Sequence, residues 1–257
     1  MNIASKPWLV KNLWDDRYES YSIIENEKML ANVCIFKTDM IISGQPVRAH
    51  QFGAVATRAN QRGRGLARLL INHVLGKYPD TPAFLGANPS VVDFYPQFGF
   101  KPMQTYRPVV DFVVNNPGGL GVKCGPDDEC VKKAIYERHA FSNMVDSLNA
   151  QPVQICQMLT NPRYKDFIYY LPKCDAVIIA RQKSSTLYLE DVITAKPLTF
   201  DMLAAQLPFA GINCIEFGFC PDWLGVSPRW VPLDEPYFIR GGWNLPEKFR
   251  FPVMSET

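Results

Sequence analysis

A pair of glycines, Gly63 and Gly65, constrains the fold of this chain more than any other feature. They lie between an apolar, strand-like segment, residues 52–57, and residues 66–75, where apolar side chains recur at helical spacing. A strand that turns through glycines into a helix directs the free N–H groups of the first helical turn toward one point, at the positive end of the helix dipole. Arginines at positions 58, 62, 64 and 68 add positive charge there. The segment therefore predicts a phosphate-binding turn, followed by a helix that ends at Gly76.

Two widespread phosphate-binding motifs do not fit this turn. A dinucleotide-binding fingerprint needs a third glycine, where this chain has Arg68, and an acidic residue about 20 positions later, where it has Leu85-Gly86-Ala87. A P-loop needs a Gly-Lys-Ser/Thr ending, which the turn lacks. The turn instead resembles motif A of the Gcn5-related N-acetyltransferases (GNAT). This motif consists of Arg or Gln, any two residues, Gly, any one residue, and then Gly or Ala. Arg62, Gly65 and Ala67 occupy these three places.

A second resemblance to the same family follows at the expected distance. Residues 83–87 are strand-like, and the next segment contains Phe94-Tyr95 and, three residues later, Gly99-Phe100, which is similar to the family's motif B. Asn88-Pro89 is typical of a helix N-cap and first helical residue, and the glycine of motif B is typical of a helix end. With both motifs in the right order, the chain resembles GNAT proteins over residues 18–106.

The resemblance implies an α/β (α+β) fold in which a mixed, mostly antiparallel sheet is flanked by helices. The Asn-Asn-Pro-Gly-Gly-Leu-Gly segment at 115–121 predicts a boundary between a GNAT domain, residues 1–114, and a second domain, residues 122–257. The second part repeats an order of strands, helix and strand, so we expect a degenerate GNAT-like domain, as in a bacterial subgroup of the family. Its segment 194–198 has no glycine, and no second cofactor site is expected there.

Local patterns predict several other elements. Residues 21–24 and 29–36 flank a polar turn and predict a β-hairpin. Residues 1–17 carry the spacing of a short amphipathic helix, and residues 127–148 are expected to be mostly helical. The tail at 221–252 is rich in Pro and Trp and is expected to be irregular.

The family resemblance implies that acetyl-CoA lies between the strand at residues 52–57 and the strand at residues 83–87. Backbone groups of the first strand are expected to pair with the pantetheine arm, and one N–H there is expected to face the thioester oxygen. The glycines are expected to enclose the pyrophosphate, and a tight turn without a ligand is the alternative. The expected cofactor contacts are Val55, Ala56, Thr57, Arg62, Gly63, Arg64, Gly65, Leu66, Ala67 and Asn88.

Tyr95 is the expected catalytic residue, because the tyrosine of the family's motif B protonates the departing CoA thiolate. A phenol with a pKa of about 10 can donate to the conjugate base of a thiol with a pKa of about 8.5 at a site that excludes water. The alternative is a core tyrosine, since residues 91, 94, 95 and 98 form an apolar stripe at helical spacing. Pro96 lies inside this segment and is expected to bend it.

No general base stands out in the sequence. The strand at residues 47–52 lacks a carboxylate, and His50 is its only side chain with a pKa useful for this role. A structural or surface histidine is the alternative, and ordered water could also relay the proton. The other candidates, which we do not rank, are Glu27, Asp93, Asp191 and the carboxylate of Thr257.

Composition is that of a globular protein, with 47% hydrophobic and 20% charged residues and a formal net charge of +2. No apolar run reaches the roughly 20 residues of a membrane span, and no secretory pattern opens the sequence. Seven scattered cysteines without a CxxC pair favour reduced thiols and a cytoplasmic location. The three histidines are far apart in sequence, so no metal site is expected.

We therefore expect an N-acetyltransferase that moves acetyl from acetyl-CoA to a primary amine by direct attack in a ternary complex. The acceptor, a small molecule or a peptide, and the oligomeric state are left open by the sequence. The main alternative is a non-catalytic acyl-CoA-binding sensor or scaffold. A nucleic-acid-binding module would use the arginine cluster. The small net charge of the chain makes this alternative less favoured, because nucleic-acid-binding domains are usually strongly basic. Neither a nucleic acid nor a membrane is expected as a partner.

Overall fold

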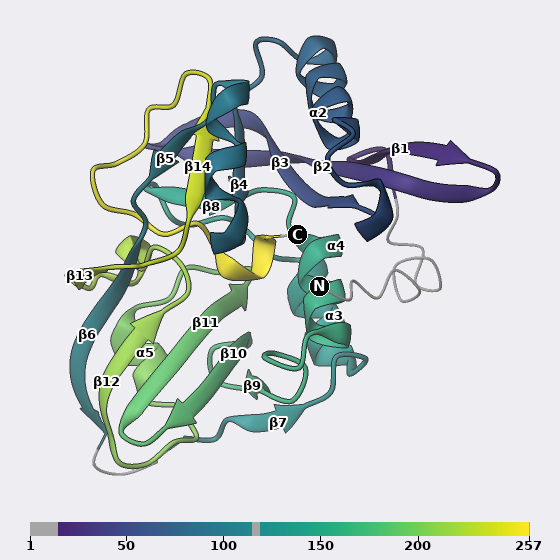
Figure 1. Ribbon diagram of the computed structural model, residues 1–257. Helices are drawn as coiled ribbons and strands as arrows, with labels where there is room; N and C mark the ends of the chain where they lie inside the picture. The colour runs from purple at the N-terminus through teal and green to yellow at the C-terminus, as the bar shows by residue number, and fades with distance from the viewer. Residues whose placement is uncertain (1–14, 115–118, 257) are drawn as a thin grey trace.

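The computed structural model describes residues 15–114 and 119–256, which form two β-sheets of seven strands each. Figure 1 shows the first sheet with helix α2 in the upper half of the view, the second sheet in the lower half, and the yellow C-terminal segment between them. The first sheet has the order β1-β2-β3-β4-β14-β5, with β8 added to β2, and the second has the order β13-β6-β12-β11-β10-β9-β7. Each sheet has one parallel pair, so the expected mixed, mostly antiparallel α/β fold is confirmed.

The first sheet begins with an antiparallel meander of β1 (Tyr18–Glu25), β2 (Lys28–Ile42) and β3 (Gln45–Thr57). Both central residues of each connecting turn have positive φ angles, Asn26-Glu27 in the first and Ser43-Gly44 in the second. Such turns match the right-handed twist of the paired strands. The predicted hairpin is thereby confirmed, and it continues into a third strand.

Helix α2 (Leu66–Lys77) follows the glycines, and β4 (Ala83–Gly86) then runs parallel to β3. The buried side chains of α2 pack on one face of the sheet and are Leu70, Ile71 and Val74. They recur at the spacing that the sequence showed, because three and four residues make about one helical turn. The predicted strand, turn, helix and strand are all present.

The predicted helix end at Gly76 is wrong, because α2 continues to Lys77 and Tyr78 is its C-cap. The ring of Tyr78 packs edge-to-face against His50, with the centroids 4.5 Å apart. Its hydroxyl donates to the carboxylate of Glu19 at 2.9 Å. These tertiary contacts hold the last turn of the helix, and they outweigh the weak helix propensity of one glycine.

Motif B forms two short 3₁₀ helices, η2 (Pro89–Phe94) and η3 (Pro96–Phe98). Oδ1 of Asn88 accepts a hydrogen bond from the N–H of Ser90 at 3.0 Å, which confirms the predicted N-cap. The break between the helices falls directly before the proline that opens η3, where a bend was expected. Gly99 has a φ of 80° and ends η3, as predicted.

The second sheet repeats the order of the first. β9 (Ile168–Leu171), β10 (Ala176–Lys183) and β11 (Thr186–Thr194) form an antiparallel meander. Helix α5 (Phe200–Ala204) follows, and β12 (Ile212–Phe217) runs parallel to β11. This arrangement matches that of β1, β2, β3, α2 and β4, so the expected repetition of the fold is present.

Two strands cross between the halves of the chain. β6 (Tyr106–Val114) pairs with β12 and with β13 (Arg229–Pro232) in the second sheet. β14 (Tyr237–Arg240) inserts between β4 and β5 (Lys101–Met103) in the first sheet. The boundary expected at 115–121 therefore does not coincide with the division between the sheets, because β6 lies before it and β14 after it. The C-terminal tail, which was expected to be irregular, supplies β13 and β14.

Helices α3 (Glu129–Tyr136) and α4 (Gln151–Thr160) cover one face of the second sheet together with the 3₁₀ turn η5 (Val253–Ser255). The expectation of helix over most of 127–148 is wrong beyond the end of α3. Strand β8 (Val145–Ser147) follows instead, because its backbone pairs with the end of β2 in the first sheet.

The remaining short elements are β7 (Val122–Cys124), η1 (Ala59–Gln61) and η4 (Asp222–Leu224). The N-terminal helix expected over residues 1–17 lies largely outside the described residues. Across the described ranges, no helix is both long enough and apolar enough to cross a membrane.

Candidate functional site

The two parallel strands of the first sheet separate toward their carboxyl ends. Over the described residues, β3 and β4 pair at two positions only, the last being Gln51 with Phe84. We call the separated ends, residues 52–57 of β3 and 85–86 of β4, the strand fork. Open α/β sheets bind ligands at the carboxyl ends of parallel strands. The fork also leaves one edge of β3 without a strand partner, as an extended ligand would need.

A β-bulge lies on the β3 side of the fork. Ala54 has a φ of 47°, a left-handed conformation that residues other than glycine rarely adopt. The register between β2 and β3 shifts at this place, and Asn32 of β2 donates from its side-chain amide to the carbonyl of Ala54 at 3.2 Å. Bulges bend a strand and redirect its groups. The bulge therefore changes the direction in which the end of β3 presents its backbone.

The glycines of motif A lie beyond the end of β3 and open α2. Gly63 and Gly65 have φ angles of 79° and 75°, which glycine adopts without steric cost. Gly65 is the N-cap, and no side chain caps the helix, so the first N–H groups of α2 are free for a ligand. Arg62, Arg64 and Arg68 are exposed beside them, and no carboxylate of the described residues forms an ion pair with these three. The turn has the donors and the charge that a pyrophosphate requires.

The corresponding helix of the second sheet is closed. The hydroxyl oxygen of Thr199 caps α5 by accepting from the N–H of Met202 at 3.3 Å. The segment before it, 194–198, contains no glycine. Because a side chain occupies this helix start, it resembles an ordinary structural N-cap rather than an anion site.

Tyr95 lies between η2 and η3, on the face of the sheet that α2 covers. Its ring is 6% exposed and contacts the rings of Phe94, Phe100 and Phe238. Burial raises the pKa of the Tyr95 phenol, so the group is protonated at neutral pH, as a proton donor must be. No hydrogen bond joins its hydroxyl to another described residue.

The opposite face of the fork holds a carboxylate that the sequence did not single out. Tyr237 of β14 pairs with Gly86, the last residue of β4, and its hydroxyl donates to the carboxylate of Glu256. Tyr237 and Phe238 are consecutive in a strand, so their side chains lie on opposite faces. Phe238 contacts Tyr95, whereas Tyr237 reaches Glu256. The end of β4 therefore has a phenol on one face and a carboxylate on the other.

Glu256 lies in an enclosed and charged environment. Burial raises the pKa of Glu256 to about 7, and the nearby Arg250 guanidinium and the hydrogen bond from Tyr237 only partly oppose this increase. Oε1 of Glu256 is fully enclosed and has no hydrogen-bond partner among the described residues. The guanidinium of Arg250 itself donates to Glu235 at 2.6 Å. A carboxyl group with a pKa near 7 can accept a proton at neutral pH and release it again.

His50 does not lie in the fork. It stands where β3 still pairs with β4, four residues before Ala54, which corresponds to about 13 Å along the strand. The imidazole is 4% exposed and packs against Tyr78. Burial lowers the pKa of His50 to about 4, with the Lys37 ammonium as a smaller cause. A catalytic role for His50 stays a prediction, and its position fits the structural alternative better.

The other carboxylates considered as bases are exposed to solvent or belong to the second sheet. Glu27 is in the exposed turn between β1 and β2, Asp93 is exposed on η2, and Asp191 is in β11 of the second sheet. Thr257 lies outside the described residues. Within the described ranges, no group of three or more His, Cys, Asp or Glu side chains could hold a metal ion.

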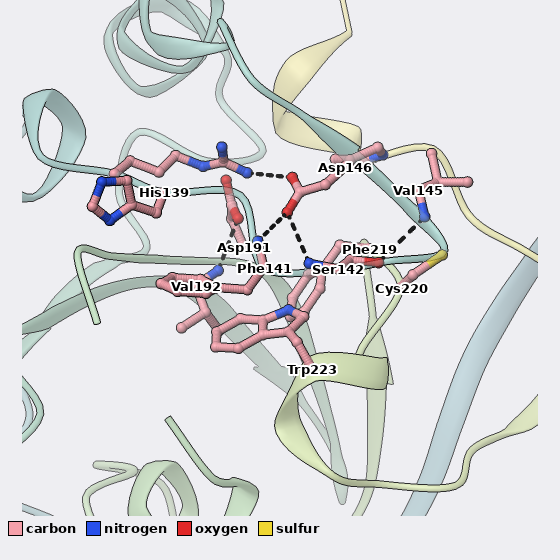
Figure 2. A pocket seen from close by; sticks show the side chains of 12 residues that line it. His139, Phe141, Ser142, Val145, Asp146, Asp191, Val192, Phe219, Cys220 and Trp223 are labelled. Carbon is pink, nitrogen blue, oxygen red and sulfur yellow. Dashed lines mark hydrogen bonds and ion pairs between the residues drawn. The ribbon is translucent and has the colours of Figure 1, made fainter. Parts of the chain in front are cut away.

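A pocket between the two sheets encloses Asp191 (Figure 2). Asp146 pairs with Arg138 at 2.5 Å, and Asp191 accepts from the side-chain amide of Gln154 at 2.7 Å. Figure 2 shows both carboxylates above the indole ring of Trp223 in this view. Each carboxylate already has a donor, and β8 pairs with the end of β2 that is remote from the bulge. The cluster therefore joins β8 to β11 and is separate from the fork.

The structure brings most of the predicted site residues to the end of the first sheet where β3 and β4 separate. Val55, Ala56 and Thr57 form the end of β3, residues 62–67 form the turn that follows, and Asn88 lies just after β4. Tyr95 lies in the adjoining segment. The residues that the sequence did not reveal are Asn32, Tyr237 and Glu256, which strand pairing brings to the fork from distant parts of the chain.

Comparison with known proteins agrees with this geometry. Residues 7–103 match the family model of the acetyltransferase (GNAT) domain, a range that contains the strand fork, the motif A glycines and Tyr95. Over these residues the chain is similar to the GNAT acetyltransferases. No curated protein matches the sequence.

Solved structures with the GNAT fold match both halves of the chain. A probable N-acyltransferase from Enterococcus faecalis has a TM-score of 0.58 and 17% identity, over 93% of this chain and 66% of that one. A GCN5-related N-acetyltransferase from Kribbella flavida has a TM-score of 0.53 and 15% identity, over 93% and 64%. Eis1 from Mycobacterium abscessus has a TM-score of 0.52 and 16% identity, over 87% and 64%. The chain spans slightly less than two thirds of each structure, and at these identities the likeness shows the fold.

Proposed function

We propose that this protein transfers acetyl from acetyl-CoA to a primary amine by direct attack in a ternary complex. The observation that carries the proposal is the strand fork with the motif A glycines beside it. The fork leaves the backbone of Val55, Ala56 and Thr57 open to an extended ligand, and α2 begins with free N–H groups. The match of residues 7–103 to the GNAT domain supports the same function.

Acetyl-CoA fits this arrangement in one direction. Its pyrophosphate lies against the N–H groups from Gly63 to Ala67, where the helix dipole and the exposed arginines favour negative charge. Its pantetheine arm lies along the open edge of β3 as a short added strand. This direction places the thioester deeper in the fork, near the bulge at Ala54. Asn88, which lies just beyond β4, is a further contact for the arm.

The two faces of the fork suit the two proton transfers. As the amine nitrogen attacks the thioester carbon, the amine proton passes to Glu256, through the Tyr237 hydroxyl or through one water molecule. The C–S bond then breaks, and the Tyr95 phenol protonates the leaving thiolate. The pKa of about 7 for Glu256 supports its role as the base, and the position of the Tyr95 phenol on the other face of the fork supports its role as the acid.

The acceptor is proposed to be a small molecule or a peptide that carries a primary amine. A nucleic acid or a membrane surface is not needed to complete the site. All seven cysteines are free thiols in the structure, which supports a cytoplasmic location, where acetyl-CoA is present. Acetyl is proposed as the acyl group because the family model that matches is that of an acetyltransferase.

Calorimetric titration with acetyl-CoA tests the cofactor site directly, using Gly65→Asp and Gly44→Asp. Both glycines have nearly the same left-handed backbone, with φ angles of 75° and 74°, and a Cβ at either would meet open space. The two substitutions therefore impose the same local strain. Only the variant at position 65 places a carboxylate where the pyrophosphate would lie.

We expect the affinity for acetyl-CoA to fall at least about tenfold in Gly65→Asp, because a like charge beside the phosphates is unfavourable. Gly44→Asp should bind as the wild type does. Equal affinities in the two variants, or no binding by the wild type, would contradict the proposed cofactor site.

A further inference from the structure

We infer that Asn32 is a positioning residue of the acyl-transfer site, because its side-chain amide fixes the direction of the peptide group between Ala54 and Val55. The inference rests on the proposed function, and it concerns how the fork polarises the thioester. Asn32 lies in β2 and faces away from α2, since its neighbours Ala31 and Val33 both pack on the α2 side. Its side chain is largely buried beside the bulge.

Two hydroxyl groups of β1 orient the Asn32 amide. Oδ1 of Asn32 accepts from Oγ of Ser20 and from Oγ of Ser22, both at 2.8 Å. The other end of the amide faces the carbonyl oxygen of Ala54 at 3.2 Å. A carbonyl oxygen can only accept, so the group facing it must be the NH₂ group of Asn32. The amide is thereby held at both ends in one orientation.

This orientation sets the direction of the next backbone N–H. In a trans peptide group the C=O and N–H bonds point in opposite directions. Since the carbonyl of Ala54 points toward Asn32, the N–H of Val55 points away from Asn32 and from β2. Beyond Gln51, β4 no longer pairs with β3. The N–H of Val55 therefore points toward the side of β3 that has no strand partner, where it is available to a ligand in the fork.

The bulge needs such a support because Ala54 is not glycine. A left-handed backbone is unfavourable for a residue with a Cβ, and it persists only where the surroundings hold it. Between the pairs Asn32–Ala56 and Cys34–Gly53, two residues of β3, Ala54 and Val55, lie opposite the single residue Val33. Without the Asn32 amide, the peptide group between Ala54 and Val55 would lose the hydrogen bond that holds it, and the N–H of Val55 would no longer be fixed toward the fork.

In the proposed reaction, negative charge develops on the thioester oxygen as the amine attacks. A preorganised N–H aimed at that oxygen acts mainly in the transition state, and loss of one such donor lowers kcat by about 10²- to 10³-fold in enzymes with oxyanion holes. Asn32 acts on this donor indirectly. A misdirected N–H retains part of its effect, so we expect a loss of about tenfold to a hundredfold.

The test compares Asn32→Ala with the double variant Ser20→Ala/Ser22→Ala and with the control Thr38→Val. Thr38 is a buried polar residue on the same strand and the same face as Asn32, but it pairs with Ala49, away from the bulge. Each protein is examined for kcat, for the KM of acetyl-CoA, and for the Kd of CoA, which lacks the carbonyl. Isotope-edited infrared spectra of bound acetyl-CoA labelled with ¹³C at the thioester carbonyl report its polarisation directly.

We expect Asn32→Ala to lower kcat about tenfold to a hundredfold, with the KM of acetyl-CoA and the Kd of CoA changed by no more than about twofold. The downshifted carbonyl band of bound acetyl-CoA should return toward its position in water. The double serine variant should show the same pattern at about three- to tenfold, because the amide keeps its place but loses its orientation. Thr38→Val should match the wild type in all four measurements.

A folded Asn32→Ala protein with the wild-type kcat and carbonyl band would overturn the inference. So would parallel losses of kcat and CoA affinity in Asn32→Ala and Thr38→Val, since they would reveal a general structural effect. If the wild type binds acetyl-CoA but acetylates no amine, the proposed function fails separately, and the infrared band of the bound thioester still decides the role of Asn32. Failure of the wild type to bind acetyl-CoA would overturn both.

Discussion

Replacing Glu256 by Gln should make the protein more stable at alkaline pH, although it removes a charged group that Arg250 faces. The folded structure raises the pKa of this carboxyl from its ordinary value of 4.5 to about 7. One pKa unit corresponds to about 1.4 kcal/mol, so ionising the carboxyl costs the folded protein about 3 kcal/mol. Glutamine has the same shape and can still accept from the hydroxyl of Tyr237, but it never ionises.

The sign follows from which state binds the proton more tightly. Between about pH 4.5 and pH 7 the unfolded chain has lost this proton while the folded protein keeps it. The free energy of unfolding therefore decreases as the pH rises through this range, and the full penalty is present above about pH 7. Below about pH 4.5 both states are protonated, and the wild type and Glu256→Gln should be equally stable.

Urea unfolding of both proteins at about pH 4 and about pH 8.5 measures this difference, since other titrating groups are common to the two and cancel. We expect Glu256→Gln to gain about 2 to 3 kcal/mol relative to the wild type on going from the lower to the higher pH. The same pH dependence in both proteins would refute the assignment of a near-neutral pKa to Glu256. A variant that is less stable than the wild type at high pH would show that the ionised carboxylate is stabilised by Arg250 rather than strained.

Three further predictions concern catalysis, the pocket and the fold. Tyr95→Phe should lower kcat by about 10²-fold or more while the affinity for acetyl-CoA stays within about twofold, because the ring contacts remain and only the proton donor is lost. An unchanged kcat in a CoA-release assay would show that Tyr95 takes no part in the mechanism. Asp191→Asn should leave the kinetic constants of acetyl transfer unchanged, since the pocket is separate from the fork, and a large loss of kcat would show coupling between them. A fragment of residues 1–114 should not unfold cooperatively, because it lacks β14 and β8 of the first sheet; a sharp two-state transition in circular dichroism would contradict the importance of the strand exchange.

The parts of the site that could be predicted are those that local sequence specifies. Gly63 and Gly65 form the turn into α2 that their spacing before a helix indicated, and Asn88 caps the segment that it precedes. Each of these depends on neighbours within a few residues, so a short pattern is sufficient to reveal it. The separation of β3 and β4, in contrast, was expected only from the family resemblance, because it arises from a loss of pairing between distant segments that no local pattern reveals.

The base and the bulge support could not be predicted for the same reason. Glu256 follows η5 on the second sheet, and it meets the fork through Tyr237 of β14, which inserts between β4 and β5. Strand β14 comes from a tail rich in Pro and Trp that gave no strand pattern. Asn32 is one polar residue in a long apolar strand, and its role depends on the conformation of Ala54 in the next strand. Side chains that act across strand pairings leave no periodic signal in a single sequence.

Domain boundaries and helix ends also depend on contacts between distant segments. The Pro- and Gly-rich segment at 115–121 predicted a boundary between two domains. However, because β6 and β14 are exchanged, each sheet contains strands from both sides of that segment. Gly76 illustrates the same point on a smaller scale, since the contacts of Tyr78 with His50 and Glu19 extend the helix past a residue that often ends one.

The most direct test of the central claim is amine-dependent release of CoA by the wild-type protein. The free thiol would be followed with a thiol reagent while acetyl-CoA is held fixed and a broad panel of primary amines and peptides is varied. We expect saturable, amine-dependent release of CoA at a rate well above hydrolysis, and this rate should rise with pH through about 7 as Glu256 ionises. Tight binding of acetyl-CoA with no release on any amine would contradict the proposed activity and favour a protein that only binds the cofactor.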